Sequence, residues 1–365
     1  MTQKCIALLG QPDEPTDAVE EYCRYLGEAL SVNGFDLQLV RVPWAEKGWS
    51  PALRELGKRA EAWRDDWVLV QYTALAWSKR GFPLRFLRVL KVLRAAGTRV
   101  GVVFHDVEPY QGKRGIDKIR RQAQLRVLRE AARMSDLAVF TVPMEMLSWI
   151  RHSARNAVFI PVGANLSSPE KAWRERIRDS DRPPTIAIFG ITGGKWGNAE
   201  MARITAALEY LTQKIGKVRV IVFGRHSEFF KDDFTALSKR IPVEAQMLGL
   251  LTPERVVESF ASSDVLLFVR GAISSRRGSA IAGIACGLPV IAMEGRETAP
   301  PITDAGVVLL SPNGTEREWG EALERIFTDR EYYDSLAERS RRAQEQHFSW
   351  QAIATRYAKV LNKSE

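Results

Sequence analysis

The chain has 365 residues, 45% of them hydrophobic and 27% charged, which is the composition of a soluble globular protein long enough for two domains of moderate size. No apolar run reaches the roughly 18 residues of a membrane-spanning helix. The three cysteines have no paired spacing and the four histidines are scattered, which argues against disulfides and a metal site. The net charge of +9 is unevenly spread: residues 79–133 contain 15 Lys and Arg against 4 Asp and Glu, which indicates an anionic partner.

The first part of the chain alternates short apolar runs with segments of helical period. The runs are KCIALLG, DLQLVRV, DWVLVQYT, TRVGVVFH, LAVFTV and NAVFIPVG, and they predict six buried strands. Because acidic residues follow KCIALLG at once, we interpret the N-terminus as a strand and a turn, not as a signal peptide, and we expect a cytoplasmic protein.

A polar, proline-terminated stretch at residues 167–184 predicts a linker, after which a second series of strands begins. That series is TIAIFG, KVRVIVFG, VEAQMLG, DVLLFVRG, LPVIAM and GVVLLS, followed by helical segments around 315–328, 330–345 and 349–362. Repeated β-α units predict parallel sheets with helices on both faces. We therefore predict an α/β protein with two doubly wound, Rossmann-like domains facing across a cleft, residues 1–166 and 167–348, and a last helix at about 349–365.

Ligands of such domains bind at the carboxyl ends of the strands, where the segment SSRRGSAIAGIACGLPVIA (residues 274–292) leads from a strand into a helix. A helix N-terminus presents unpaired N–H groups, and hydroxyl and guanidinium groups beside it suit a phosphate. An ordinary serine cap next to two solvated arginines is the alternative. The predicted anion-binding residues here are Ser274, Ser275, Arg276, Arg277, Gly278 and Ser279.

A second glycine-rich loop, FGITGGKWGN, follows the first strand of the second domain. Its glycines and lysine can hold the same phosphates, although its spacing is not that of a Walker A loop, and a plain glycine turn with a surface lysine would look alike. Another strand-exit loop brings Arg225 to this edge. The predicted residues of these two loops are Gly190, Gly193, Gly194, Lys195 and Arg225.

The strand exits of the first domain hold a further set of candidates. His105 and Asp106 follow the strand TRVGVVF directly, where a histidine can bond a sugar hydroxyl or move a proton; the alternative is that they only cap a helix or order the loop. Gly10, Asp13 and Trp77 lie in neighbouring exit loops, and Trp77 could stack on a sugar ring.

An ordered set of segments resembles family 4 glycosyltransferases of the GT-B fold. The segments are FHD, FIPVGANL, LTPERVVESFASSDVLLF, ACGLPVIA and the C-terminal FSW. The resemblance implies hexosyl transfer from a nucleotide diphosphate sugar with retention of configuration, without a metal ion or any cofactor beyond the donor. It implies an acceptor site in the first domain, a donor site in the second, and a last helix, about 349–365, that crosses back onto the first domain. The candidate catalytic residues are His105 at its strand exit and the cations Lys195 and Arg276, which would stabilise the charge on a leaving diphosphate.

The chain departs from this family at one motif. The family carries two glutamates separated by seven residues, at the positions that Ser274 and Ala282 occupy here. By the resemblance, these glutamates contact the donor sugar and the ribose. In this chain the first contact would fall to a hydroxyl and the arginine loop.

The basic segment SKRGFPLRFLRVLKVLRAAGTR (residues 78–99) predicts an amphipathic helix that can lie on anionic lipid. Basic residues recur at Arg85, Arg88, Lys91 and Arg94, with apolar residues between them; a core-facing helix with a solvated basic face is the alternative. We expect peripheral contact with the inner face of the membrane through residues 78–133, and no nucleic acid, because stacking aromatics are not interleaved with the charges.

The sequence thus predicts a retaining glycosyltransferase that acts on a glycan or a lipid-linked acceptor in bacterial surface polysaccharide synthesis. Two alternatives stay open. One is a catalytically silent nucleotide-sugar-binding or scaffold protein, which the absent glutamates favour. The other is a different GT-B enzyme, such as a sugar-nucleotide epimerase, which would need no separate acceptor.

Overall fold

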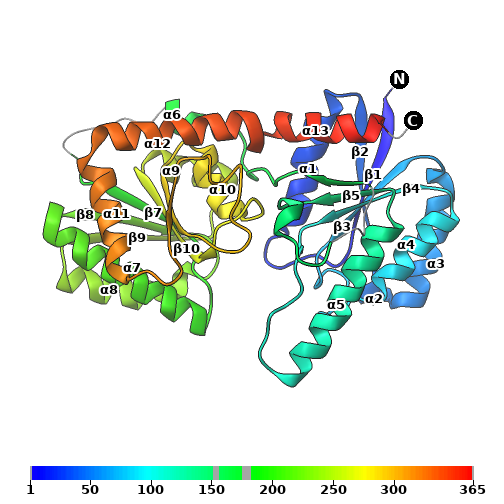
Figure 1. The fold of residues 1–365 in the computed structure, drawn as a ribbon, viewed down its shortest axis with the longest axis horizontal. Helices are drawn as coiled ribbons and strands as arrows, with labels where there is room; N and C mark the ends of the chain where they lie inside the picture. Colours follow the sequence, from blue (N-terminus) through cyan, green and yellow to red (C-terminus); the bar gives the residue numbers. More distant parts are fainter. Residues whose placement is uncertain (1, 151–155, 175–181, 364–365) are drawn as a thin grey trace. The chain divides into compact units, whose positions relative to one another are not determined.

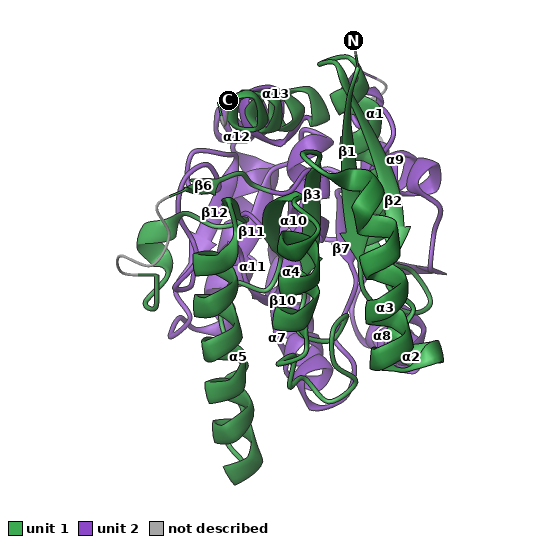
Figure 2. Ribbon diagram, turned by 90° about the vertical axis from the view of Figure 1, so that its right-hand side faces the viewer, with its two compact units in different colours: residues 1–161, 350–365 green, residues 162–349 purple. Residues whose placement is uncertain are grey.

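The apolar runs form two parallel six-stranded sheets in the computed structural model, which describes residues 2–150, 156–174 and 182–363 (Figure 1). The chain divides into unit 1, residues 1–161 with 350–365, and unit 2, residues 162–349 (Figure 2). The predicted divisions lie at 166/167 and 348/349. The predicted α/β class with two doubly wound sheets is confirmed.

The sheet of unit 1 has the strand order β2-β1-β3-β4-β5-β6, with all neighbours parallel. Its strands are β1 (Gln3–Leu9), β2 (Phe35–Arg41), β3 (Trp67–Tyr72), β4 (Arg99–Phe104), β5 (Leu137–Phe140) and β6 (Ala157–Phe159). The central strand β3 is buried along its whole length because helices cover both faces of a parallel sheet. The strand order reverses between β1 and β3, so a ligand of this unit is expected beside the ends of those strands.

The helices of unit 1 are α1 (Ala18–Ser31), α2 (Trp44–Lys47), α3 (Trp49–Ala60), α4 (Phe86–Ala95), α5 (Gly115–Met134) and α13 (Trp350–Asn362). Asp17 caps α1 by accepting hydrogen bonds from the first-turn N–H groups of Val19 and Glu20. Short 3-10 turns lie at Glu61–Trp63 and Met144–Met146. The last of these helices, α13, belongs to unit 1 although it is the C-terminal end of the chain, as expected.

The attachment of α13 to unit 1 rests on two specific contacts besides apolar packing. The hydroxyl groups of Tyr22 and Tyr357 are hydrogen-bonded at 2.9 Å, and the indole N–H of Trp67 donates to the Leu361 carbonyl at 3.1 Å. These bonds satisfy polar atoms that are buried on both sides of the contact, so they favour this packing over others.

The sheet of unit 2 has the order β12-β11-β10-β7-β8-β9 and is also parallel. Its strands are β7 (Thr185–Phe189), β8 (Val218–Phe223), β9 (Val243–Gly249), β10 (Val265–Ala272), β11 (Val290–Met293) and β12 (Val307–Leu310). Strands β8 and β9 lie on one side of β7, and the next strand in the chain, β10, lies on its other side. The switch point, where the strand order reverses, therefore lies between β7 and β10.

The helices of unit 2 are α6 (Lys171–Arg174), α7 (Lys195–Ile215), α8 (Lys231–Arg240), α9 (Pro253–Ala261), α10 (Gly278–Ala285), α11 (Glu316–Thr328) and α12 (Arg330–Ala343). A 3-10 turn at Ser227–Phe230 precedes α8, and a π-helical turn at Gln344–Phe348 ends α12. Thr315 and Glu318 form a capping box at the start of α11. The predicted linker includes α6, and its residues 175–181 lie outside the described part of the chain.

The packing of α4 corrects the prediction that this amphipathic helix lies on a lipid surface. Its apolar side chains Phe86, Val89, Leu90 and Leu93 are completely buried in the core of unit 1. Only the basic side of α4 faces solvent, so the alternative of a core-facing helix holds for this element. Among the described residues, no helix is long and apolar enough to cross a membrane.

Candidate functional site

The switch point of unit 2 is bordered by two of the predicted loops. Residues 190–194 follow β7 and lead into α7, while residues 273–277 follow β10 and lead into α10. The carboxyl ends of β7 and β10 are neighbours in the sheet, so both loops open on the same edge.

The loop after β7 is fixed by a buried carboxylate on α7. Glu200 is 5% exposed and accepts hydrogen bonds from the backbone N–H and the hydroxyl of Thr192, both at 2.7 Å. The first turn of α7 presses against the same loop, since a Cβ at Gly197 would lie 1.9 Å from the Thr192 carbonyl oxygen. The fold of the loop therefore depends on a glycine and a glutamate that lie inside the helix.

Two arginines at this edge have no partner within the described residues. Arg270 lies in β10, its side chain makes no hydrogen bond or ion pair with any described residue, and its guanidinium packs against Gly190, where a Cβ would come within 3.2 Å of it. Arg277 makes no side-chain hydrogen bond or ion pair either, and its Nε is buried. A partly buried cation without a counter-charge is unfavourable, so this pair is poised to receive an anion.

The pKa directions support the same picture. Burial lowers the pKa of the Arg270 guanidinium; Glu200 opposes the shift and the positive charge of Arg225 adds to it. Burial also lowers the pKa of Arg277, and repulsion from Arg276 and Arg270 contributes. The arginines are close enough to repel one another, and a bound dianion would relieve that repulsion.

Arg276 has a partner that the sequence analysis did not anticipate. Its Nε and Nη2 donate to the two carboxylate oxygens of Glu297 at 2.7 and 3.1 Å, and both side chains are mostly buried. This forked pair fixes the orientation of Arg276 and neutralises much of its charge.

The prediction that Ser274 and Ser275 present their hydroxyls to a ligand is corrected by their burial. Each residue is 1% exposed. Their carbonyl groups accept hydrogen bonds from the backbone N–H groups of Arg277 and Val162, respectively, so the two serines support the loop. Gly278, which is exposed, and Ser279, which is partly exposed, form the first turn of α10 and stay accessible.

The remaining predicted residues of unit 2 lie on the same edge. Gly194 caps α7 with a φ of 66°, and Lys195, the first residue of the helix, is exposed. Gly193 faces the ring of His226, since a Cβ at this glycine would lie 3.8 Å from the ring, beside Arg225 at the end of β8. Lys195 and Arg225 thus add positive charge around the central arginine pair.

In unit 1, four predicted residues lie at the carboxyl edge of the sheet. A Cβ at Gly10 would lie 2.3 Å from the Ala76 carbonyl oxygen, so the loops after β1 and β3 touch at the switch point. The His105 Nε2 is 2.9 Å from the Gln71 side-chain oxygen, and Asp106 accepts the Ala74 N–H at 2.7 Å. Asp13 is exposed on the loop after β1. His105 is therefore oriented by the core, and Asp106 holds a loop.

Trp77 is corrected from a ligand-stacking residue to a core residue. It is 1% exposed, its indole N–H donates to the Gln71 carbonyl at 2.8 Å, and its ring packs against Phe86. A ring buried in this way has no free face for a sugar.

Three residues of this edge were missed by the sequence analysis: Arg270, Glu200 and Glu297. Arg270 gives one usable signal, because it is the only charged residue in the otherwise hydrophobic strand VLLFVRGA. The two glutamates give no such signal, because Glu200 lies 8 residues from its partner Thr192 and Glu297 lies 21 residues from its partner Arg276.

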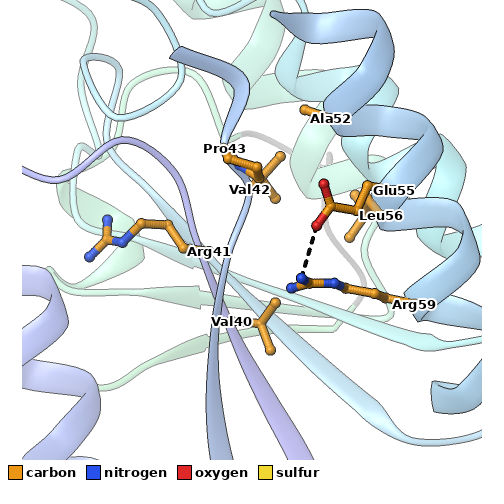
Figure 3. Close-up of a pocket in the computed structure, with 8 residues that line it drawn as sticks. All are labelled: Val40, Arg41, Val42, Pro43, Ala52, Glu55, Leu56 and Arg59. Atoms are coloured by element: carbon orange, nitrogen blue, oxygen red, sulfur yellow. Dashed lines mark hydrogen bonds and ion pairs between the residues drawn. The ribbon is translucent and has the colours of Figure 1, made fainter. Parts of the chain in front are cut away.

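A pocket in unit 1 lies apart from the predicted residues. It is lined by residues 40–43 at the end of β2 and by Ala52, Glu55, Leu56 and Arg59 of α3, with an ion pair between Glu55 and Arg59 (Figure 3). None of the predicted site residues lines it. Within the described ranges, no group of three or more His, Cys, Asp or Glu side chains could hold a metal ion.

Comparison with known proteins identifies the fold. By sequence, the chain matches no protein-family model and no curated protein. By structure, it is similar to a glycosyltransferase from Rickettsia africae, with 13% identity, a TM-score of 0.69 and coverage of 99% of this chain and 98% of that one. It is also similar to HepE from Anabaena in complex with UDP and glucose, with 16% identity, a TM-score of 0.66 and coverage of 99% and 100%.

A third similar structure is a putative UDP-N-acetylglucosamine 2-epimerase from Listeria monocytogenes, with 11% identity, a TM-score of 0.62 and coverage of 100% of this chain and 97% of that one. At these identities the likeness establishes the fold alone. The chain has the GT-B fold over its whole length. Because proteins of this fold have more than one activity, the residues of the site indicate the function and the fold does not.

Proposed function

We propose that the protein is a glycosyltransferase that binds a nucleotide diphosphate sugar in unit 2. The observation that carries the proposal is the pair Arg270 and Arg277 at the switch point, whose guanidinium groups have no partner among the described residues. A diphosphate brings two negative charges and several acceptor oxygens, which match two guanidinium groups with forked donors. The similar structure of HepE, which holds UDP and glucose, supports this choice of ligand, and the similar Rickettsia glycosyltransferase supports the choice of activity.

The proposed mechanism stabilises the leaving group. Negative charge builds on the diphosphate as the bond to the sugar breaks, and Arg270, Arg277 and Lys195 would hold that charge in a preorganised site. The first turn of α10 adds N–H groups at Gly278 and Ser279. This scheme needs no metal ion, and the resemblance to family 4 adds retention of configuration and hexosyl transfer.

The acceptor is proposed to bind at the carboxyl edge of unit 1, near Gly10, Asp13, His105 and Asp106. The His105 ring, held by Gln71, would bond an acceptor hydroxyl or take its proton. We propose a glycan or lipid-linked acceptor in surface polysaccharide synthesis, in the cytoplasm or on the inner face of the membrane.

Membrane contact is proposed for a surface that we name the α5 face. We define it by exposed residues of α5 and of the two loops that contact α5, and its apolar members are Leu84, Tyr110, Ile116 and Ile119. Arg120 and Gln124 of α5 bind the two neighbouring loops, through the carbonyl groups of Arg80 and Gly81 and the N–H of Tyr110. The basic members are Lys79, Arg80, Arg85, Lys113, Arg114, Lys118 and Arg121.

The test of the activity is a transfer assay with candidate nucleotide sugars, an acceptor extract and excess chelator. We expect a product that forms equally with and without EDTA and keeps the donor's anomeric configuration by NMR. An inverted product, or loss of activity on chelation, would contradict the retaining or the metal-independent part. Conversion of the nucleotide sugar without any acceptor would favour the epimerase alternative, and nucleotide binding without turnover would favour the silent one.

A further inference from the structure

Glu297 lies beside the proposed diphosphate site on a loop that is fastened to the end of β10. The Thr298 hydroxyl donates to the Ile273 carbonyl at 2.6 Å and accepts the Gly295 N–H at 2.9 Å. Gly295 touches β10 closely, since a Cβ there would lie 2.3 Å from that of Ala272. The loop after β11 is therefore docked where the arginine loop begins, and the position of Glu297 is set by the fold.

The carboxylate of Glu297 is kept ionised in this position. Burial favours its neutral form, but hydrogen bonds and charge from Arg276, the charge of Arg277 and the Ser274 hydroxyl outweigh burial and hold the pKa of Glu297 below its usual value. A negative charge next to a phosphate site works against phosphate binding. The charge of the Glu297 carboxylate must therefore have a function other than binding the diphosphate.

The position of Ser274 indicates the function of the Glu297 carboxylate. Ser274 occupies the position at which family 4 glycosyltransferases carry the first glutamate of their motif, and it is a close neighbour of the Glu297 carboxylate. A carboxylate accepts hydrogen bonds only, through about four lone-pair sites, and Arg276 occupies one on each oxygen. The remaining sites suit the hydroxyl groups of a sugar attached to the diphosphate.

We propose that Glu297 supplies, from the loop after β11, the carboxylate that binds hydroxyl groups of the donor sugar, with Arg276 as the residue that positions it. This inference rests on the proposed function. It gives the two neighbouring arginines different partners. Arg277 binds the diphosphate, and Arg276 positions the Glu297 carboxylate.

The experiment compares the affinities of UDP and UDP-glucose for the wild-type protein and for the Glu297→Gln variant by calorimetry. Glutamine keeps the shape and one acceptor oxygen but removes the charge. We expect UDP to bind the variant as tightly as the wild type, or a few-fold more tightly, because a negative charge beside the phosphates is gone. We expect UDP-glucose to bind about tenfold more weakly, because charged hydrogen bonds to the sugar are lost.

Glu294→Gln is the matched control, since Glu294 is an acid on the same loop that is not part of the arginine pairing, and it should change neither affinity. Thermal unfolding establishes that each variant is folded. Equal weakening of UDP and UDP-glucose in Glu297→Gln would overturn the inference, because Glu297 would then act only through the phosphate site. An unchanged affinity for UDP-glucose would overturn it too. Failure of the wild type to bind UDP, GDP, dTDP, ADP or CMP in the same calorimeter would instead refute the proposed function.

Discussion

Arg270 and Arg277 hold two positive charges close together at an edge that water reaches only in part. Neither guanidinium has a counter-charge within hydrogen-bond distance among the described residues. Burial and repulsion from Arg276 and Arg270 lower the pKa of Arg277, and burial and the charge of Arg225 lower the pKa of Arg270. Residues that destabilise an empty site in this way are typical of binding sites, where stability and function compete. The two arginines should therefore have opposite effects on folding and on binding.

The prediction is made for Arg270→Met, which keeps much of the length of the side chain and removes its charge. We expect the free energy of unfolding without ligand to rise by about 1 kcal/mol, since replacing a poorly compensated charge with an apolar group is often stabilising. The affinity for a nucleoside diphosphate should fall at least tenfold. Chemical denaturation and calorimetry measure the two effects.

Lys239→Met provides the control for that substitution. Lys239 is an exposed cation of α8 in the same unit, and its replacement should leave both quantities nearly unchanged. If Arg270→Met destabilised the empty protein and left nucleotide affinity intact, Arg270 would be a structural residue and the charge argument would be wrong.

At the scale of elements, the segment 78–133 that was predicted to contact the membrane contains two helices, α4 and α5, which differ in the exposure of their apolar residues. The amphipathic pattern of α4 is used for core packing, because all four apolar residues of its inner side are buried. The 20-residue helix α5 projects beyond the other elements of unit 1 in Figures 1 and 2. Its first turns carry Ile116 and Ile119, which are 50% and 62% exposed, next to Lys118.

For the α5 face, we predict binding to vesicles that contain anionic lipid and much weaker binding to neutral ones. Each basic residue near a charged surface contributes about 1 kcal/mol, so Lys113→Gln with Lys118→Gln should reduce partitioning roughly tenfold or more. Ile116→Ser with Ile119→Ser should reduce it by a similar amount through lost apolar burial. Co-sedimentation with vesicles measures the partition coefficient.

Val32→Ser is the control, because Val32 is an 85% exposed apolar residue of unit 1 outside the α5 face, and it should not alter partitioning. Equal binding to neutral and anionic vesicles, or unchanged binding of both double variants, would contradict the proposed membrane contact.

At the scale of the whole molecule, the sequence was sufficient for the fold. Apolar runs separated by helical periods identify parallel strands because such strands are buried on both faces, and every predicted run became a strand. The return of the last helix to unit 1 followed from a resemblance, and the contact of Tyr357 with Tyr22 gives its physical basis.

The residues of the site were harder to predict from the sequence than the fold. The cluster SSRRGS marked the right loop, but burial of Ser274 and the pairing of Arg276 depend on residues from other elements. Pattern and spacing describe neighbours along the chain; they do not describe a carboxylate that arrives from a loop 21 residues away. The same limit applied to Trp77, whose burial is decided by tertiary packing.

The most direct test of the account is a calorimetric titration of the whole chain with UDP, GDP, dTDP, ADP and CMP, in magnesium and in EDTA. We predict that one nucleoside diphosphate binds, equally in both conditions, and that Arg270→Gln with Arg277→Gln lowers its affinity about a hundredfold, since two charged hydrogen-bonding groups are lost. A folded wild-type protein that binds no nucleotide, or a double variant that binds as tightly as the wild type, would contradict the assignment of unit 2 as a donor site.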